Sequence, residues 1–226
     1  MEYMEHGALL KMNGKMTYEP IQDLQTIRKY LRDIILGLDY LHSKRVIHGD
    51  IKPENLLVGP DFVVRIADFG VSYILESDNP FVTKALGTPA FTAPECENKC
   101  FLAFPLDIWA LGVTLVMMIT GICPFAGDTI QDTFEKIQIH TPVIPPDLPT
   151  NLKHLITALL TKDPSQRIIM SQLKEHPWVT RNGEESLRQP YETITDNTTQ
   201  KECDSTKFSQ VEIISMNEDN ADLNPS

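Results

Sequence analysis

Between positions 22 and 42, apolar residues recur at intervals of three and four. They are Leu24, Ile27, Leu31, Ile34, Leu38 and Leu41. That spacing places all of them on one face of a helix, while charged residues occupy the other faces. The segment therefore predicts an amphipathic helix whose apolar stripe covers a core.

A second stretch, from Ile108 to Gly127, contains no charged residue and is long enough to cross a bilayer. However, glycine, threonine and proline dilute it, and the break at Gly121–Pro124 leaves only about 13 apolar-rich helical residues. A helix of that length that is apolar on all sides is typical of a globular interior. We therefore expect a buried helix here, not a membrane span.

Three short runs of mainly aliphatic residues predict strands: Val46–Ile47, Leu56–Val58 and Val63–Ala67. Further helices are expected at Thr129–Ile139, Asn151–Leu160 and Met170–Glu175. A cluster of prolines separates the first of these helices from the second. Because the strands are short and pair locally, the pattern favours a mostly helical fold with a few hairpin strands at one edge. It excludes a doubly wound sheet.

Composition changes near Thr180. From Arg181 to Ser226 the chain has four Lys/Arg against ten Asp/Glu, and apolar residues are sparse except around Val211–Ile214. This predicts a folded domain over residues 1–180 and an acidic, disordered tail over residues 181–226.

The bulk composition limits the classes of partner and of compartment. The chain has 226 residues and a net charge of −11, which argues against nucleic acid as a main partner. Its four cysteines show no CxxC spacing, so reduced thiols are expected. No signal peptide is recognisable at the N-terminus. Together these features predict a cytoplasmic protein without a membrane partner.

Four polar residues suggest chemistry. The carboxylate of Asp50 suits acceptance of a hydroxyl proton, and the cation of Lys52 suits a phosphate that gains charge. Asn55 and Asp68 supply the hard oxygen ligands that Mg²⁺ prefers. Each residue also has an ordinary interpretation: a capping or loop aspartate, a solvated surface lysine, and Asx-turn residues.

Five ordered motifs decide between these interpretations. They are Asp68-Phe69-Gly70, Gly87–Phe91, Ala93–Glu95, Asp107–Gly112 and Arg167. With Asp50 to Asn55 before them, residues 1–180 resemble the C-terminal lobe of a eukaryotic protein kinase. Lys52 resembles the serine/threonine class, because tyrosine kinases usually have alanine there. The run His176–Glu185 is most similar to calcium/calmodulin-dependent protein kinase kinases.

The resemblance implies a role for each matching residue. Catalytic roles are implied for Asp50, Lys52, Asn55 and Thr88, with Thr88 bridging Asp50 and Lys52. ATP would be bound by Met4, Glu54, Asn55, Leu57 and Asp68, with Leu57 beneath the adenine and Mg²⁺ on Asn55 and Asp68. Thr83 would be a regulatory phosphorylation site. Structural roles are implied for His48, Phe69 (in the core), Glu95 (paired with Arg167), Asp107 and Arg167.

Two departures from the family pattern matter. Gly49 stands where most of these kinases have an arginine that clamps a phosphorylated loop. The resemblance also begins at the hinge, Met1–Gly7, so we expect the small N-terminal lobe to be missing and the isolated chain to transfer little phosphate.

Two functions therefore remain open. One is a serine/threonine kinase that uses ATP and Mg²⁺ and acts on a protein substrate, which could be another kinase. The alternative is a non-catalytic, kinase-derived C-lobe that serves as a binding module. The acidic tail lacks a basic amphipathic helix, so calmodulin binding by residues 181–226 is not expected.

Overall fold

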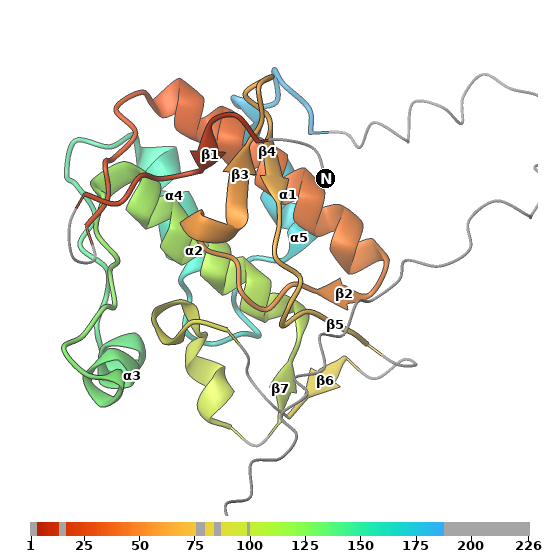
Figure 1. Ribbon diagram of the computed structural model, residues 1–226, viewed down its shortest axis with the longest axis vertical. Coiled ribbons are helices and arrows are strands. Elements are labelled where there is room, and N and C mark those ends of the chain that lie inside the picture. Colours follow the sequence, from red (N-terminus) through yellow and green to blue (C-terminus); the bar gives the residue numbers. More distant parts are fainter. Residues whose placement is uncertain (1–3, 14–16, 76–79, 84–86, 99, 188–226) are drawn as a thin grey trace, which may run out of the picture. The chain divides into compact units, whose positions relative to one another are not determined.

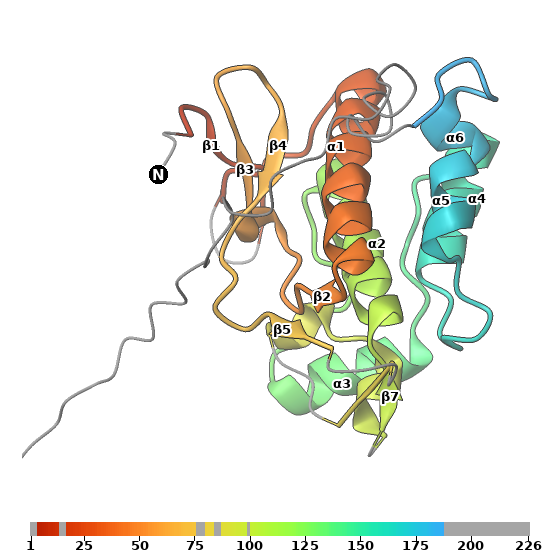
Figure 2. The same cartoon turned by 90° about the vertical axis from the view of Figure 1, so that its right-hand side faces the viewer.

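Helices α1 (Leu24–Ser43) and α2 (Phe104–Thr120) lie side by side at the centre of the fold (Figures 1 and 2). This computed structural model describes residues 4–13, 17–75, 80–83, 87–98 and 100–187. α1 begins where the Asp23 carboxylate accepts hydrogen bonds from the backbone N–H groups of Gln25 and Thr26. Of its predicted stripe, Ile27, Leu31, Ile34 and Leu38 have no exposed surface, while Leu24 and Leu41 at the two ends are partly buried.

α2 is the buried helix that the uncharged stretch predicted. Its residues from Leu106 to Met118 are buried on every side. It ends at Gly121, whose φ of 70° is left-handed, and a Cβ there would lie 2.3 Å from the Tyr18 carbonyl oxygen. In the part of the chain that the structure describes, no helix is long and apolar enough to cross a membrane.

The other predicted helices are present within a residue of their expected ends. They are α3 (Ile130–Ile139), α4 (Thr150–Leu159) and α5 (Met170–Glu175). A further short helix, α6 (Pro177–Thr180), was not predicted because four residues show no apolar period. α4, α5 and α6 lie together on one side of the two central helices (Figure 2).

All strands among the described residues are two or three residues long. The main sheet is antiparallel, with the order β1 (Gly7–Ala8), β3 (Leu56–Val58) and β4 (Val64–Ile66). Two further pairs are β2 (Val46–Ile47) with β5 (Tyr73–Ile74) and β6 (Phe81–Val82) with β7 (Phe101–Leu102). Strands β2, β3 and β4 were predicted. The others were not, because two residues carry no alternation and only their partners define them.

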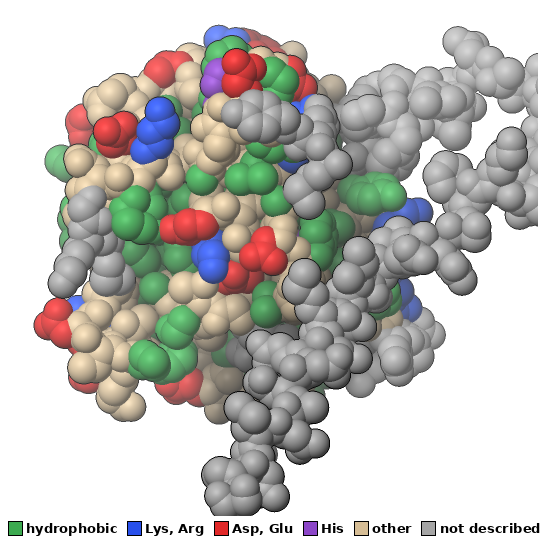
Figure 3. All heavy atoms as spheres, in the orientation of Figure 1, with side chains coloured by type: hydrophobic (Ala, Val, Ile, Leu, Met, Phe, Trp, Pro, Cys, Tyr) green, Lys and Arg blue, Asp and Glu red, His purple; other side chains and the backbone are tan. Residues whose placement is uncertain are grey.

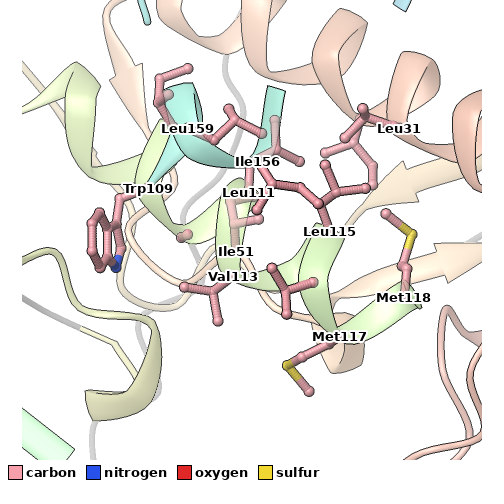
Figure 4. Packing of buried hydrophobic residues seen from close by; sticks show 14 of the residues in the cluster. Leu31, Ile51, Trp109, Leu111, Val113, Leu115, Met117, Met118, Ile156 and Leu159 are labelled. Carbon is pink, nitrogen blue, oxygen red and sulfur yellow. The ribbon is translucent and has the colours of Figure 1, made fainter. Parts of the chain in front are cut away.

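Side chains from α1, α2 and α4 meet in one hydrophobic core (Figure 4). Leu31, Leu115 and Ile156 are among its buried members. The ring of Trp109 stacks on that of Phe125, with centroids 5.4 Å apart. Three cysteines, Cys96, Cys100 and Cys123, are free thiols.

The fold continues past the predicted boundary at residue 180. The Arg32 guanidinium on α1 donates to the carbonyl oxygens of Val179, Glu185 and Ser186 at 2.6, 3.0 and 3.1 Å. Leu187 is buried with the core. Residues 181–187 therefore pack with the domain, because the half-buried Arg32 guanidinium binds the carbonyl groups of Glu185 and Ser186. The rest of the predicted tail, including Val211–Ile214, lies outside the described residues.

Candidate active site

One carboxylate on helix α2 holds the loop that follows β2 through hydrogen bonds. Asp107 is fully buried in the first turn of α2. Its two oxygens accept hydrogen bonds from the backbone N–H groups of His48 and Gly49 at 3.0 and 2.9 Å. The His42 ring at the end of α1 also bonds Asp107, at 2.9 Å. The position of the loop is therefore set by the packing of the two central helices.

His48 braces the same loop from inside. Its ring has no exposed surface. Nδ1 accepts the Asp50 backbone N–H at 3.3 Å, so Nε2 carries the proton that it donates to the Ala67 carbonyl at 3.0 Å. Both nitrogens are thus engaged with backbone. His48 therefore ties the Asp50 loop to the segment at Ala67.

Asp50 is the centre of the site. It is 8% exposed, and both of its oxygens are occupied. Oδ1 accepts from the Thr88 backbone N–H at 2.9 Å and from the Thr88 hydroxyl at 2.8 Å. Oδ2 contacts Lys52 Nζ at 2.6 Å and accepts from Asn55 Nδ2 at 3.0 Å. Lys52 Nζ also donates to the Thr88 hydroxyl at 2.7 Å, so Thr88 bridges Asp50 and Lys52.

These contacts determine the charge of the carboxylate. Burial of Asp50 opposes its ionisation, but the hydrogen bonds from Lys52 and Thr88 outweigh that effect and lower the pKa of the Asp50 carboxyl. Asp50 is therefore an anion at neutral pH. Such a group orients a hydroxyl and takes its proton only when bond formation is advanced.

Thr88 reaches Asp50 because the preceding residue is glycine. Gly87 has a φ of 98°, a conformation that side-chain-bearing residues rarely adopt. A Cβ at this position would lie 2.3 Å from the Gly49 carbonyl oxygen and 2.9 Å from Asp50 Oδ1. The sequence analysis placed Gly87 in a motif without identifying this close approach.

Asn55 and Asp68 form the candidate metal site. Asn55 is buried, and its Nδ2 donates to the Asp50 carbonyl at 2.8 Å and to the Asp50 carboxylate, which leaves Oδ1 for a ligand. Asp68 is exposed, with a φ of 60°, and its Oδ1 accepts the Gly70 N–H at 3.2 Å. The Ala67 N–H donates to the Asn55 carbonyl at 2.8 Å, so the two segments are joined directly.

The neutral amide oxygen of Asn55 and the anionic carboxylate of Asp68 suit Mg²⁺. This ion usually takes one or two protein ligands and completes its shell with water and phosphate. Among the described residues there is no group of three or more His, Cys, Asp or Glu side chains that could hold a metal. The residues present therefore fit an ion that arrives with a phosphate ligand and do not form a closed protein cage.

The predicted nucleotide-binding residues lie on and beside the three-stranded sheet. Leu57 is half-buried on β3 and pairs with Ala8 of β1, and Met4 is half-buried just before β1. Glu54 is exposed, and its carboxylate accepts the Tyr18 hydroxyl. Burial and this carboxylate raise the pKa of Tyr18. The Tyr18 contact was not predicted, since nothing near Glu54 in the sequence indicates it.

On the face shown in Figure 3, a small group of acidic and basic side chains lies among hydrophobic ones, near the lower end of β3. The site thus brings the Asp50 carboxylate, the Lys52 cation and the side-chain oxygen of Asn55 together at the start of an apolar strand.

The segment after Thr88 is anchored by a buried ion pair. The Arg167 guanidinium binds the Glu95 carboxylate at two points, 2.6 and 2.8 Å. It also donates to the carbonyls of Pro105 and Thr161 and lies over the Trp109 ring at 5.1 Å. The pair that the sequence implied is therefore part of a larger junction.

Two other predicted residues differ in their surroundings. Phe69 was expected in the core but is 48% exposed; its ring packs at a steep angle against the buried His48 ring, with centroids 5.2 Å apart. Thr83, the predicted regulatory residue, is exposed after β6. Neither contributes to the network around Asp50.

The protein kinase domain family matches residues 1–179. Two plant relatives are the serine/threonine-protein kinases GRIK1 and GRIK2 of Arabidopsis thaliana. They are 49% identical over 168 residues and 50% identical over 158 residues, respectively.

A calcium/calmodulin-dependent protein kinase kinase of Caenorhabditis elegans is 39% identical over 189 residues, which confirms the resemblance found in the motifs. The alignments cover 74%, 69% and 80% of this chain but only 42%, 39% and 34% of GRIK1, GRIK2 and the nematode kinase. The chain therefore spans less than half the length of these relatives.

Proposed function

The chain belongs to the protein kinase domain family, and from this premise we propose that its site transfers the γ-phosphate of ATP to a serine or threonine hydroxyl of a protein. The observation that carries the proposal is the ion pair between Asp50 and Lys52, with the Thr88 hydroxyl hydrogen-bonded to both. A carboxylate and an ammonium held 2.6 Å apart match the two tasks of the reaction, orienting a hydroxyl and stabilising charge on the phosphoryl group.

Asp50 orients the attacking hydroxyl. Both Asp50 oxygens are already hydrogen-bonded, so a substrate hydroxyl binds by replacing one of the present donors. Lys52 is the candidate for release, because its flexible stem lets its ammonium turn toward the phosphate. Thr88 then keeps Oδ1 in place, and the proton passes to Asp50 late in the transfer.

Mg²⁺, when bound, neutralises charge on the phosphates. Asn55 Oδ1 and the Asp68 carboxylate are the atoms of this chain that would hold it. Asn55 also orders Asp50, since its Nδ2 donates to both the carbonyl and the carboxylate of that residue. A single side chain would therefore both hold the metal and order the base.

The adenine is assigned to the apolar floor made by Leu57 on β3, with Met4 alongside. Leu57 lies two residues beyond Asn55, so the floor and the metal ligand share one short segment. This continuity supports the proposal, because it would hold the two ends of a bound nucleotide in a fixed relation.

The test is phosphoryl transfer to protein substrates by the native protein, compared with its Asp50→Asn variant. Asparagine keeps the size of the side chain but removes its charge. We expect kcat to fall by about 100-fold or more, the range for loss of a general base. Wild-type activity that survives in Asp50→Asn would contradict the proposal, as would the absence of ATP-dependent transfer in wild-type protein that carries the small lobe.

Asp147→Asn serves as the matched control. This aspartate is exposed in the proline-rich loop before α4, so the same chemical change should leave transfer unaltered. Retained binding of ATP without any transfer by the wild type would instead support the non-catalytic binding module.

A further inference from the structure

Phe62 occupies a strained position at the tip of the hairpin that joins β3 to β4. Its N–H donates to the Gly59 carbonyl at 3.0 Å, and the Gly59 N–H donates to the Val63 carbonyl at 3.0 Å. In hairpin loops of this kind a glycine or asparagine usually takes the left-handed position. Here Phe62 takes it, with a φ of 56°. A bulky residue in this conformation is strained, so other contacts of Phe62 must offset the strain.

The ring of Phe62 lies against the segment that precedes β1. It stacks on the His6 ring with centroids 4.4 Å apart and planes inclined by 19°. The backbone carbonyl of Phe62 accepts a hydrogen bond from Lys29 Nζ on α1 at 2.7 Å. Phe62 is nevertheless 51% exposed, so burial in the core does not account for its position. The stack on His6 and the hydrogen bond from Lys29 account for its position.

The hairpin of β3 and β4 (Figure 1) connects the two segments that supply the proposed metal ligands, Asn55 and Asp68. β3 begins directly after Asn55, and β4 leads to Asp68. β1 begins directly after His6, whose N–H donates to the Val58 carbonyl at 3.2 Å. The stack on Phe62 therefore fastens β1 to the hairpin beyond the last backbone bonds of a two-residue strand.

We propose that Phe62 and His6 are positioning residues for ATP, an inference that rests on the proposed function. Strand β1 consists of two residues, so few hydrogen bonds hold it against β3. The stack adds a side-chain contact at the end of this short ladder and keeps the apolar floor at Leu57 and the segment at Met4 in register. Loss of either ring loosens the adenine subsite and leaves Asp50 and Lys52 in place.

The test is the affinity of the native protein for Mg²⁺·ATP, measured by displacement of a fluorescent nucleotide. Phe62→Gly removes the ring and also relieves the backbone strain. We expect it to raise Kd about three- to tenfold, the equivalent of one aromatic pair. Phe62→Tyr, which keeps the stack, should restore the wild-type Kd. In transfer assays the KM for ATP should rise by a similar factor while kcat changes by less than about twofold.

The reciprocal variant His6→Ala makes the proposal independent of any folding defect at Phe62. It should raise Kd as Phe62→Gly does, and the double variant should be no weaker than either single one, because the two rings act as a pair. Fully additive effects would overturn the proposal, as would a Phe62→Gly Kd within about twofold of the wild type. A wild type that binds ATP without transferring phosphate would contradict the proposed function and still leave this Kd comparison decisive.

Discussion

Arg167 and Glu95 form a two-point ion pair in the interior, with their side chains 0% and 3% exposed, although 72 residues separate them in sequence. The guanidinium and the carboxylate are both taken out of water, so each depends on the other for compensation. Through this pair the segment that holds Thr88 is tied to the loop between α4 and α5.

Arg167→Ala should destabilise the protein strongly. Removing one partner leaves a buried charge unpaired, which costs about 3–5 kcal/mol of the free energy of unfolding. Urea denaturation measures the effect. Arg181→Ala is the matched control, because that arginine forms an exposed pair with Glu185 and should shift the urea midpoint little. Equal shifts in the two variants would show that burial of the Arg167 pair is unimportant.

Gly87→Ala should abolish activity. The added Cβ would be 2.3 Å from the Gly49 carbonyl oxygen, so the Thr88 loop must move away from Asp50. Gly183→Ala is a matched control: Gly183 has a similar φ of 93°, but a Cβ there meets nothing within 4 Å. Both variants share the left-handed strain of about 1–2 kcal/mol, and only Gly87→Ala should lose phosphoryl transfer. Retained activity in Gly87→Ala would contradict the assigned contact.

The carboxyl of Asp50 should titrate below the ordinary aspartate value of 3.8. Because its pKa is lowered in the folded state, the ionised form stabilises the protein above that value, and this contribution is lost as pH falls through the lower pKa. Carbon NMR of the labelled carboxyl measures the midpoint. In Thr88→Val one donor to Asp50 is removed, so the midpoint should move upward. An unchanged midpoint would show that the Thr88 hydroxyl does not lower the pKa of Asp50.

Phosphorylation of Thr83 should not be required for activity. Gly49, with its φ of 78°, has no side chain, so no guanidinium extends from this position toward a phosphorylated loop. Thr83→Ala should therefore retain nearly full transfer activity in the native protein. A loss of more than about tenfold, equivalent to about 1.4 kcal/mol in the barrier, would refute this expectation.

The peptide of residues 181–226 should not bind calmodulin in the presence of Ca²⁺. Calmodulin targets are basic amphipathic helices, and this segment has four Lys/Arg against ten Asp/Glu. Isothermal calorimetry with the peptide checks the expectation. Micromolar or tighter binding would show that the kinase kinase relatives are a better guide to this region than its charge.

Local pattern was sufficient for the long elements. The three- and four-residue spacing along α1, the uncharged length of α2 and the proline cluster before α4 predicted these helices within a few residues, since each signal lies inside the element that it describes. The two-residue strands β1, β5, β6 and β7 were not predicted, because two residues show no alternation; β2 is as short and was predicted only because both of its residues, Val46 and Ile47, are β-branched.

The order of motifs along the chain was likewise enough to indicate the family, and it made Asp50, Lys52, Asn55 and Asp68 the candidate site residues. What only the tertiary structure decided is how these residues are held. The bonds from Asp107 to the loop at His48, the fit of Gly87 over Asp50 and the stack of Phe62 on His6 all join segments far apart in sequence. Such contacts depend on how helices pack and turns bend, and the periodicity of a single segment carries no information about its distant partners.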